Sequence, residues 1–265
     1  MKSLLLSVVA SLAALSAQAD TMKMAVTTSF ANSGLADVIL PEIEIDTGIE
    51  VQLLIVGTGQ ALKLGEQGDV DAVLVHSRAA EEAFVEGGYG THRREIMYND
   101  FVIIGPSSDP AASGAADEAI GALAAIAGAE ADFVSRGDDS GTHKMELRLW
   151  DAAGVDLAGD WYKAVGQGMG AALNTASGMN AYILSDRASW LNFGNKGDLA
   201  IVFEGDPVLF NQYAYLPVNP ELHAHVRNDL AQKLENWLTS DRAAELINGY
   251  AIAGQQLFVF NAQPE

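Results

Sequence analysis

Short apolar runs alternate with longer runs that mix polar and apolar residues, and this pattern predicts layers of β-strands and α-helices. Most of the apolar runs are rich in valine, isoleucine and leucine, as buried strands are. Strands are predicted over residues 22–26, 51–56, 72–75, 101–104, 133–134, 199–203 and 212–216. Helices are predicted near residues 35–39, 60–65, 79–85, 115–127, 144–153, 171–176, 222–238 and 241–250. The sequence therefore predicts an α/β fold.

Two of the predicted helices allow a more detailed expectation. Pro41 should end the first helix or open another one, because proline cannot donate a hydrogen bond inside a helix. The fifth helix is amphipathic, and the candidates for its buried face are Met145, Leu147 and either Leu149 or Trp150.

Three of the predicted strands lead into clusters of glycine and hydroxyl residues that begin helices. The clusters are Thr-Thr-Ser at 27–29, Gly-Thr-Gly at 57–59 and Ser-Gly-Thr at 140–142. In parallel α/β sheets, ligands bind beyond the carboxyl ends of the strands, where helix N-termini offer unpaired N–H groups and partial positive charge. Hydroxyl groups add donors without adding charge. Three such ends that meet at one point would form a cradle for a small oxyanion.

An arginine precedes the third cluster. Arg136 stands four residues before Ser140, so one guanidinium and several N–H and O–H donors can face the same tetrahedral group. The other interpretation of this segment is that Arg136 pairs with Asp138 or Asp139 at the surface. Ser140 and His143 also raise the hypothesis of a hydrolase. That hypothesis is disfavoured, because no G-x-S-x-G elbow occurs and a serine at a helix start more often caps than attacks.

The charge balance at first argues against an anion ligand. The chain has 35 acidic and 15 basic residues and a formal net charge of −20, which excludes broad nucleic-acid binding because phosphate backbones need basic surfaces. The absence of cysteine excludes disulfides, thiol catalysis and cysteine metal sites. The histidines form no H-E-x-x-H pattern, so we expect neither a metal cation nor a cofactor. Local donors, rather than total charge, decide what a cleft binds.

The first residues are typical of an export signal. Lys2 precedes a short apolar run, and Ala17-Gln18-Ala19 forms a small-x-small cleavage site. The run is too short to span a bilayer comfortably, and no cysteine follows it for lipid attachment. We therefore expect a signal peptide over residues 1–19 and a periplasmic protein that is not a lipoprotein.

Several longer motifs occur in a fixed order between residues 23 and 220. They are VTTS at 26–29, SGL at 33–35, GTGQAL at 57–62, GDVD at 68–71, LVHS at 74–77, MYNDFVIIGP at 97–106, SRGDDSGTH at 135–143 and NTASG at 174–178. With this order and spacing, the chain resembles the tungstate-binding proteins of bacterial ABC importers, a branch of the type II periplasmic solute-binding proteins. The Arg-x-x-x-Ser-Gly-Thr core is also similar to that of the related phosphate-binding proteins.

The resemblance implies a type II periplasmic-binding-protein fold, in which two α/β lobes are joined by two crossing strands and the ligand lies in a cleft between them. The first crossing is expected near residues 99–106 and the return near 205–216. One lobe would hold residues 20–100 and 207–265, and the other residues 101–206. Hinge motion would close the lobes on the ligand.

The resemblance also implies a function, which is the capture of tungstate, or molybdate, for delivery to a membrane ABC permease by a protein that is not an enzyme. The implied ligand-binding residues are Thr28, Ser29, Thr58, Arg136, Ser140, Gly141 and Thr142, with a second set of candidates at Thr27, Gly59, Ser77, Asn174 and Ser177. A monomer is expected. Two alternatives stay open: a binder of another small oxyanion such as phosphate or sulfate, and an exported serine hydrolase.

Counting donors bears on the choice of anion. Tungstate and molybdate are fully deprotonated at neutral pH and only accept hydrogen bonds, whereas phosphate carries a proton and benefits from an acceptor. A carboxylate close to a dianion is unfavourable in a desolvated cleft. We therefore expect a cleft of donors only, with Asp138 and Asp139 turned away from the ligand to hold Arg136.

Overall fold

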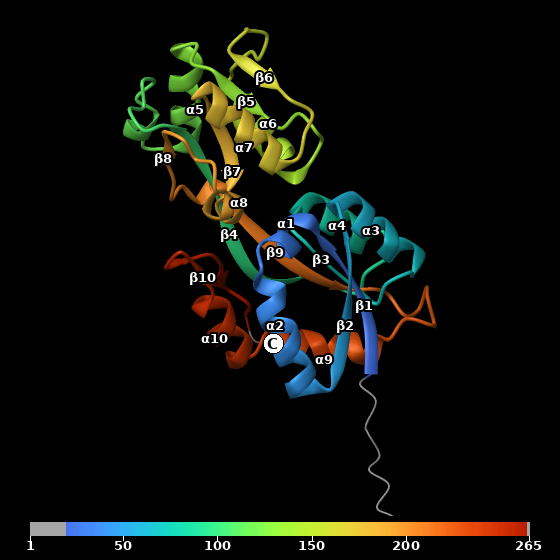
Figure 1. Ribbon diagram of the computed structural model, residues 1–265. Helices are drawn as coiled ribbons and strands as arrows, with labels where there is room; N and C mark the ends of the chain where they lie inside the picture. Colours follow the sequence, from blue (N-terminus) through green and yellow to red (C-terminus); the bar gives the residue numbers. More distant parts are fainter. Residues whose placement is uncertain (1–19, 264–265) are drawn as a thin grey trace, which may run out of the picture.

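The computed structural model describes residues 20–263, which form two α/β lobes (Figure 1). The strands are β1 (Asp20–Thr27), β2 (Ile49–Val56), β3 (Ala72–Val75), β4 (Arg94–Pro106), β5 (Phe133–Ser135), β6 (Tyr162–Ala164), β7 (Tyr182–Asp186), β8 (Leu199–Phe203), β9 (Phe210–Pro217), β10 (Ala251–Ile252), β11 (Gln255–Gln256) and β12 (Val259–Phe260). The α-helices are α1 (Thr28–Asn32), α2 (Leu35–Thr47), α3 (Thr58–Gln67), α4 (Arg78–Glu86), α5 (Ala119–Gly128), α6 (Gly141–Ala152), α7 (Met169–Met179), α8 (Arg187–Asn192), α9 (Asn228–Leu238) and α10 (Asp241–Gly249). Short 3₁₀ turns, η1 and η2, span Ser113–Ala115 and Pro207–Leu209.

One long strand is shared by both lobes. Up to Asp100, β4 pairs antiparallel with β9, which in turn pairs with β3 in the first lobe. From Phe101 onward, β4 pairs with β7 and β8 in the second lobe. The strand order is β2-β1-β3-β9-β4-β7-β5-β6, with β1 parallel to β2 and β3, and β5 parallel to β6 and β7. This arrangement confirms the predicted fold class.

The change of partner along β4 falls at the predicted lobe limit, between Asp100 and Phe101. The second predicted limit, between residues 206 and 207, falls at the start of η2, just before the chain enters β9. We propose these two points as the boundaries of the lobes.

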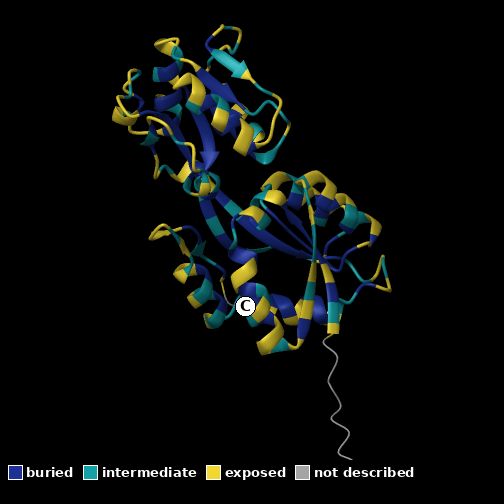
Figure 2. Cartoon of the chain, viewed as in Figure 1, coloured by how far each residue is buried: buried dark blue, intermediate teal, exposed yellow. Residues whose placement is uncertain are grey.

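Each lobe buries apolar residues on both faces of its sheet, as the dark blue strands in Figure 2 show. In the first lobe, α2, α9 and α10 cover one face and α3 and α4 the other. In the second lobe, α5 and α6 pack on one face and α7 on the other. The central strands are consequently apolar on both sides, which explains their continuous apolar runs.

Two expectations about the helices are wrong. Pro41 lies inside α2, where the buried Ile39 and Ile43 flank it; burial of this face outweighs the roughly 3 kcal/mol cost of an internal proline. Leu147 is 40% exposed. Because α6 begins at Gly141, its buried stripe includes Met145 and Leu149 and places Leu147 on the opposite face.

Other differences lie at the ends of elements and in short strands. The helix predicted from residue 222 begins only at Asn228, and Leu222 is 54% exposed. The strands β6 and β7 were not predicted: β6 has three residues with a lysine at its centre, and β7 ends in the polar residues Ser185 and Asp186. The predicted signal peptide, residues 1–19, lies outside the described residues. Within residues 20–263, no helix combines the length and apolar character needed to cross a membrane.

Candidate functional site

A cavity of about 390 Å³ opens between the lobes. The first lobe contributes residues of α1, and the second lobe contributes the loop after β5, the start of α7 and the junction of β7 with α8. The residues that line it are Thr28, Ser29, Asn32, Arg136, Gly168, Met169, Gly170, Leu173, Asp186, Ser189, Asn192 and Phe193. The cavity thus brings together the first-loop hydroxyls and the arginine that the sequence analysis selected.

The first-loop hydroxyls take different roles. Thr27 is buried and caps α1, because its Oγ1 accepts a hydrogen bond from the Phe30 N–H at 3.3 Å. The next two residues, Thr28 and Ser29, line the cavity, and Thr28 is exposed. The hydroxyl of Thr27 is thus used inside the protein as a cap, whereas Thr28 and Ser29 lie at the cleft.

Ser29 lies at the centre of a cluster of polar side chains in the first lobe. Its Oγ is 3.0 Å from Thr27 Oγ1, 3.0 Å from His76 Nε2 and 3.2 Å from the Tyr213 hydroxyl. Burial lowers the pKa of His76 to about 4, so its imidazole is neutral at physiological pH. His76 also reaches the second lobe, since a Cβ at Gly141 would lie 3.0 Å from its Cε1.

Arg136 is the cationic group of the cavity, and a carboxylate orients it. Its Nη2 donates to Asp138 Oδ2 at 2.6 Å, and its Nη1 lies 3.5 Å from Thr142 Oγ1. Burial alone would raise the pKa of Asp138, but hydrogen bonds from Ser140 and Arg136 bring it below its usual range. The Nε of Arg136 is buried and has no hydrogen-bond partner within the described structure. One edge of the guanidinium is thus fixed by Asp138, while the buried Nε–H has no partner among the described residues.

Comparison with known proteins gives a consistent result. Residues 13–242 match the profile of the PBP superfamily domain. The tungstate-binding protein TupA of Peptoclostridium acidaminophilum is 45% identical over 90% of this chain and 85% of its own length. TupA of Campylobacter jejuni is 38% identical over 88% of each chain. This chain belongs to the TupA family of the PBP superfamily.

Solved structures of this family share the same fold. The tungstate-binding protein TupA from Desulfovibrio alaskensis superposes with a TM-score of 0.88, at 45% identity over 92% of this chain and all of that chain. The structure described as the tungstate ABC transporter from Geobacter sulfurreducens gives a TM-score of 0.78, at 48% identity over 87% of this chain and 98% of that chain. The two-lobed architecture is therefore that of the TupA family.

The cluster at the start of α6 acts as a helix cap in this TupA-family chain. Ser140 Oγ accepts from the His143 backbone N–H at 3.3 Å, and Ser140 N–H donates to Asp138 at 3.2 Å. The His143 ring faces the backbone of Asp139, whose N–H donates to Nδ1 at 3.1 Å. This ring therefore points back toward the loop, and the geometry disfavours the serine-hydrolase interpretation. Asp139 is exposed and pairs with Lys144.

Several other candidates lie outside the lining of the cavity. Thr58 and Gly59 begin α3, and Ser77 precedes α4. Asn174 is exposed on α7 and bonds to Asn195 and to the Gly170 carbonyl. Ser177, on the same helix, lies beside Gly197. The structure thus groups Thr28, Ser29 and Arg136, and it leaves these five candidates around them or further away.

The most important residue that sequence reasoning missed is Asp186. It is 5% exposed, lines the cavity at the end of β7 and caps α8 by accepting from the Ser189 N–H at 2.8 Å. Burial raises its pKa. The expectation that the cleft contains donors only is therefore wrong, because an acceptor reaches it from a strand that was not predicted. The signal was present in the sequence as Ser-Asp directly after an apolar run.

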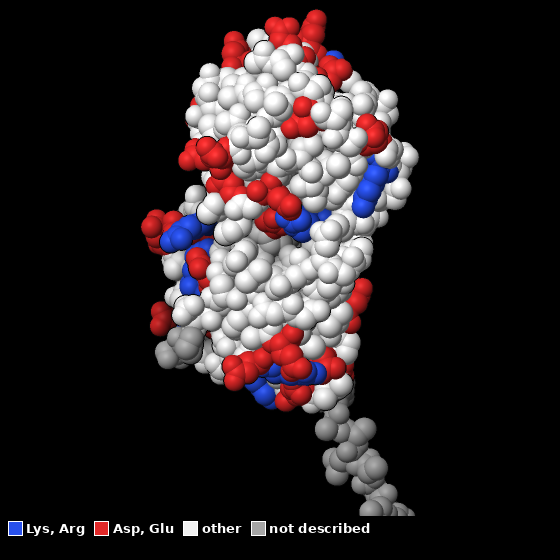
Figure 3. Space-filling model, turned by 90° about the vertical axis from the view of Figure 1, so that its left-hand side faces the viewer, with Lys and Arg blue, Asp and Glu red and all other residues white. Residues whose placement is uncertain are grey.

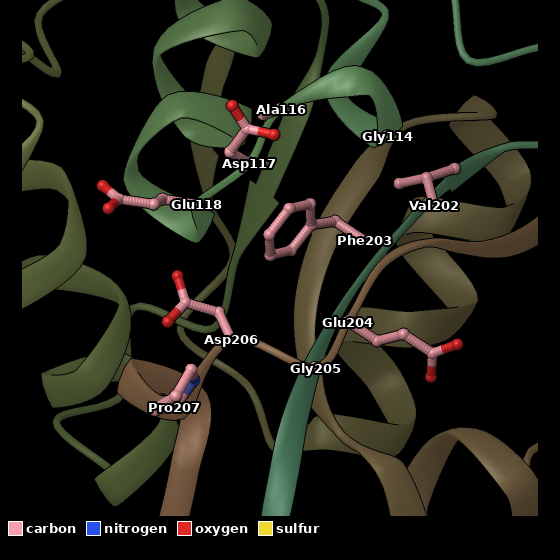
Figure 4. Close-up of a pocket in the computed structure, with 10 residues that line it drawn as sticks. All are labelled: Gly114, Ala116, Asp117, Glu118, Val202, Phe203, Glu204, Gly205, Asp206 and Pro207. Carbon is pink, nitrogen blue, oxygen red and sulfur yellow. The ribbon is translucent and has the colours of Figure 1, made fainter.

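A second cavity, of about 670 Å³, is lined by acidic residues on the second lobe (Figure 4). Two of its four carboxylates have structural roles: Asp206 accepts from the N–H groups of Ala119 and Val208, and Glu204 pairs with Arg187. Within residues 20–263, no cluster of three or more histidine or acidic residues could hold a metal ion. None of the site residues predicted from the sequence lines this cavity.

Proposed function

We propose that this protein captures tungstate, or molybdate, in the cavity between its lobes and delivers it to an ABC permease in the membrane. The observation that carries the proposal is that Arg136 of the second lobe and the residues Thr28 and Ser29 of the first lobe line the same cavity. Relatives that are named as tungstate-binding proteins, at up to 45% identity over most of the chain, support the choice of ligand.

The state of Arg136 fits an oxyanion ligand. A buried donor without a partner costs about 1–3 kcal/mol, and the Nε of Arg136 is such a donor. A tetrahedral dianion placed beside it would accept from this N–H while Asp138 keeps the guanidinium in place. Hydrogen bonds to a fully charged group are roughly twice as strong as neutral ones, so this arginine supplies the largest single contribution.

The full proposed site combines the lining residues with the start of α6. Thr28 and Ser29 donate from the first lobe and Arg136 from the second, while Ser140, Gly141 and Thr142 present the N-terminus of α6. Thr58 is retained as a proposed ligand residue, and the further candidates are Thr27, Gly59, Ser77, Asn174 and Ser177.

Export and transport are part of the same proposal. Residues 1–19 serve as a signal peptide, so the mature protein acts in the periplasm. The Geobacter structure is described as a tungstate ABC transporter, which supports a permease as the membrane partner. The protein binds and transfers its ligand without changing it chemically.

Asp186 favours a second candidate function. A carboxylate that lines the cavity can accept the proton of hydrogenphosphate, and the Arg-x-x-x-Ser-Gly-Thr core is similar to that of phosphate-binding proteins. The same experiment separates the two ligands.

Titration calorimetry of the mature protein with tungstate, molybdate, sulfate and phosphate tests the proposal. We expect binding of the first two anions only. Arg136→Ala should weaken tungstate binding by about 100-fold, the order of one charge-assisted hydrogen bond of about 3 kcal/mol. Arg148→Ala, which removes an exposed arginine of α6, should leave binding unchanged. Tight phosphate binding without a response to tungstate would overturn the assignment.

A further inference from the structure

The charges around the interlobe cavity do not balance those of the proposed dianion. Of the residues that line the cavity, only Arg136 and Asp186 are charged. Arg136 already forms an ion pair with Asp138, at 2.6 Å, whereas Asp186 forms no ion pair with any residue of the described part of the chain. With Asp186 ionised, one positive and two negative side chains therefore give a net charge of −1. A bound dianion adds further negative charge to this group.

The carboxyl group of Asp186 has little contact with solvent. The residue is 5% exposed and stands at the end of β7, where its Oδ1 accepts from the Ser189 backbone N–H at 2.8 Å. Burial raises its pKa, although hydrogen bonds from Ser189 and the positive charge of Arg136 oppose this shift. A buried carboxylate without an ion pair is unfavourable, and a second anion beside it makes the ionised form more unfavourable still.

The other elements around Asp186 supply little positive charge. The lining residues of α1, α7 and α8 are uncharged. On β9, burial raises the pKa of Tyr213 and the negative charge of Asp186 adds to this rise, so the phenol stays neutral. The next residue, Arg187, is paired with Asp100 at 2.5 Å and with Glu204 at 2.6 Å. Arg136 is thus the main positive charge that acts on Asp186.

We propose that Asp186 takes up one proton from solvent when tungstate binds, and that the neutral carboxyl then donates a hydrogen bond to the anion. This inference rests on the proposed function. Protonation removes the net negative charge of the three side chains. It also changes Asp186 from an acceptor into a donor, which suits a ligand that only accepts. Ser189 N–H can keep its bond to Oδ1 throughout. The binding of tungstate is thereby linked to the pH.

Calorimetry in buffers of different ionisation enthalpy counts the protons that are taken up with each tungstate ion. If the bound anion raises the pKa of Asp186 by about one unit, about half a proton is taken up at the pH midway between the free and bound pKa values. We expect a maximum of at least this size between about pH 5 and pH 8. Tungstate affinity should fall as the pH rises, with a slope that matches the proton count, because the two quantities are linked thermodynamically. Molybdate should behave in the same way.

Two substitutions at Asp186 assign the proton. Asp186→Asn and Asp186→Ser both keep an oxygen that can cap α8 but cannot take up a proton, so either variant that folds should bind tungstate without proton uptake.

Two control variants keep Asp186. Asp151→Asn, at an exposed acid, and Glu146→Gln, at the buried acid of α6, should both retain the uptake of the wild type. Tungstate binding by the wild type without proton uptake over this pH range would overturn the proposal. So would uptake that persists in the Asp186 variants or disappears in Glu146→Gln. Failure of the wild type to bind tungstate would instead contradict the proposed function itself.

Discussion

At the scale of single residues, the interior of the second lobe holds an acid that should make stability depend on pH. Glu146 lies on α6, is 1% exposed and accepts from the Tyr162 hydroxyl at 2.7 Å. Burial raises its pKa to about 7, although the hydrogen bond from Tyr162 opposes this shift. The folded protein therefore holds this proton more tightly than the unfolded chain does.

The direction of the pH effect follows from this difference. The stabilising contribution of Glu146 is fully present below its ordinary pKa of 4.5 and is lost as the pH rises to about 7. Glu146→Gln keeps a neutral acceptor for Tyr162 and should flatten the fall in stability over this range by roughly 3 kcal/mol. Urea unfolding at a series of pH values measures the effect.

Glu86→Gln, at an exposed acid on α4, is the matched control and should reproduce the pH profile of the wild type. An unchanged profile in Glu146→Gln would show that the carboxyl is already neutralised or hydrated in another way.

At the scale of elements, the strand ends explain what the sequence could and could not predict. The runs at residues 51–56 and 72–75 end where β2 and β3 end, because the last four residues of both strands are apolar and polar or glycine residues follow them. The hydroxyls after β1 line the cavity as their place at a strand end implied. The place of Thr28 and Ser29 directly after a predicted strand thus indicated the first-lobe part of the candidate site.

The remaining part of the candidate site depends on contacts between residues that are far apart in the sequence. Asp186 reaches the cavity only because β7 pairs with β4, far away in the sequence. The neighbours of Ser29 come from strands separated by up to 184 positions. Pairing of this kind is determined by the packing of the whole sheet. The Ser-Asp pair after an apolar run could indicate a strand end, but neither its place at the cavity nor the polar neighbours of Ser29 could be predicted from sequence.

The junction of β7 and α8 yields a prediction about ligand affinity. Ionised Asp186 repels a dianion in the cavity, so tungstate binding should weaken as the pH rises through the raised pKa of this carboxyl. Asp186→Asn removes the charge and keeps an oxygen to cap α8. Above the pKa of Asp186 we expect roughly tenfold tighter tungstate binding, about 1.4 kcal/mol, and a flatter pH dependence in calorimetry.

The exposed Asp151 of α6 provides the control, because Asp151→Asn removes an equal charge outside the cavity. Weaker binding by Asp186→Asn would show that the carboxyl supports the geometry of the site more than it repels the anion.

At the scale of the whole molecule, the large negative charge and the anion ligand are compatible. Figure 3 shows acidic side chains spread over both lobes, with few basic ones among them. Exposed charges beyond about 10 Å are largely screened by salt, whereas Arg136 and the donors of α1 lie at the cavity itself. The net charge of −20 therefore describes the outer surface and still disfavours nucleic acid as a partner.

How closely the two lobes can approach each other is also a property of the whole molecule. His76 belongs to the first lobe and Gly141 to the second, and an added Cβ at Gly141 would lie 3.0 Å from the imidazole Cε1. This is closer than the ordinary carbon contact of about 3.5–4.0 Å. A side chain at this position should therefore hold the lobes apart at the point where the ligand is enclosed.

A graded series at Gly141 tests whether this contact limits closure. We expect Gly141→Ala to weaken tungstate binding about threefold and Gly141→Val by more than about tenfold, because the larger side chain opposes closure more strongly. Small-angle scattering should show that tungstate shrinks the wild type and shrinks Gly141→Val less. The same changes at Gly178, a helical glycine with open space around it, should leave both measurements unaltered. Equal shrinkage in all variants would mean that the lobes close without bringing His76 against α6.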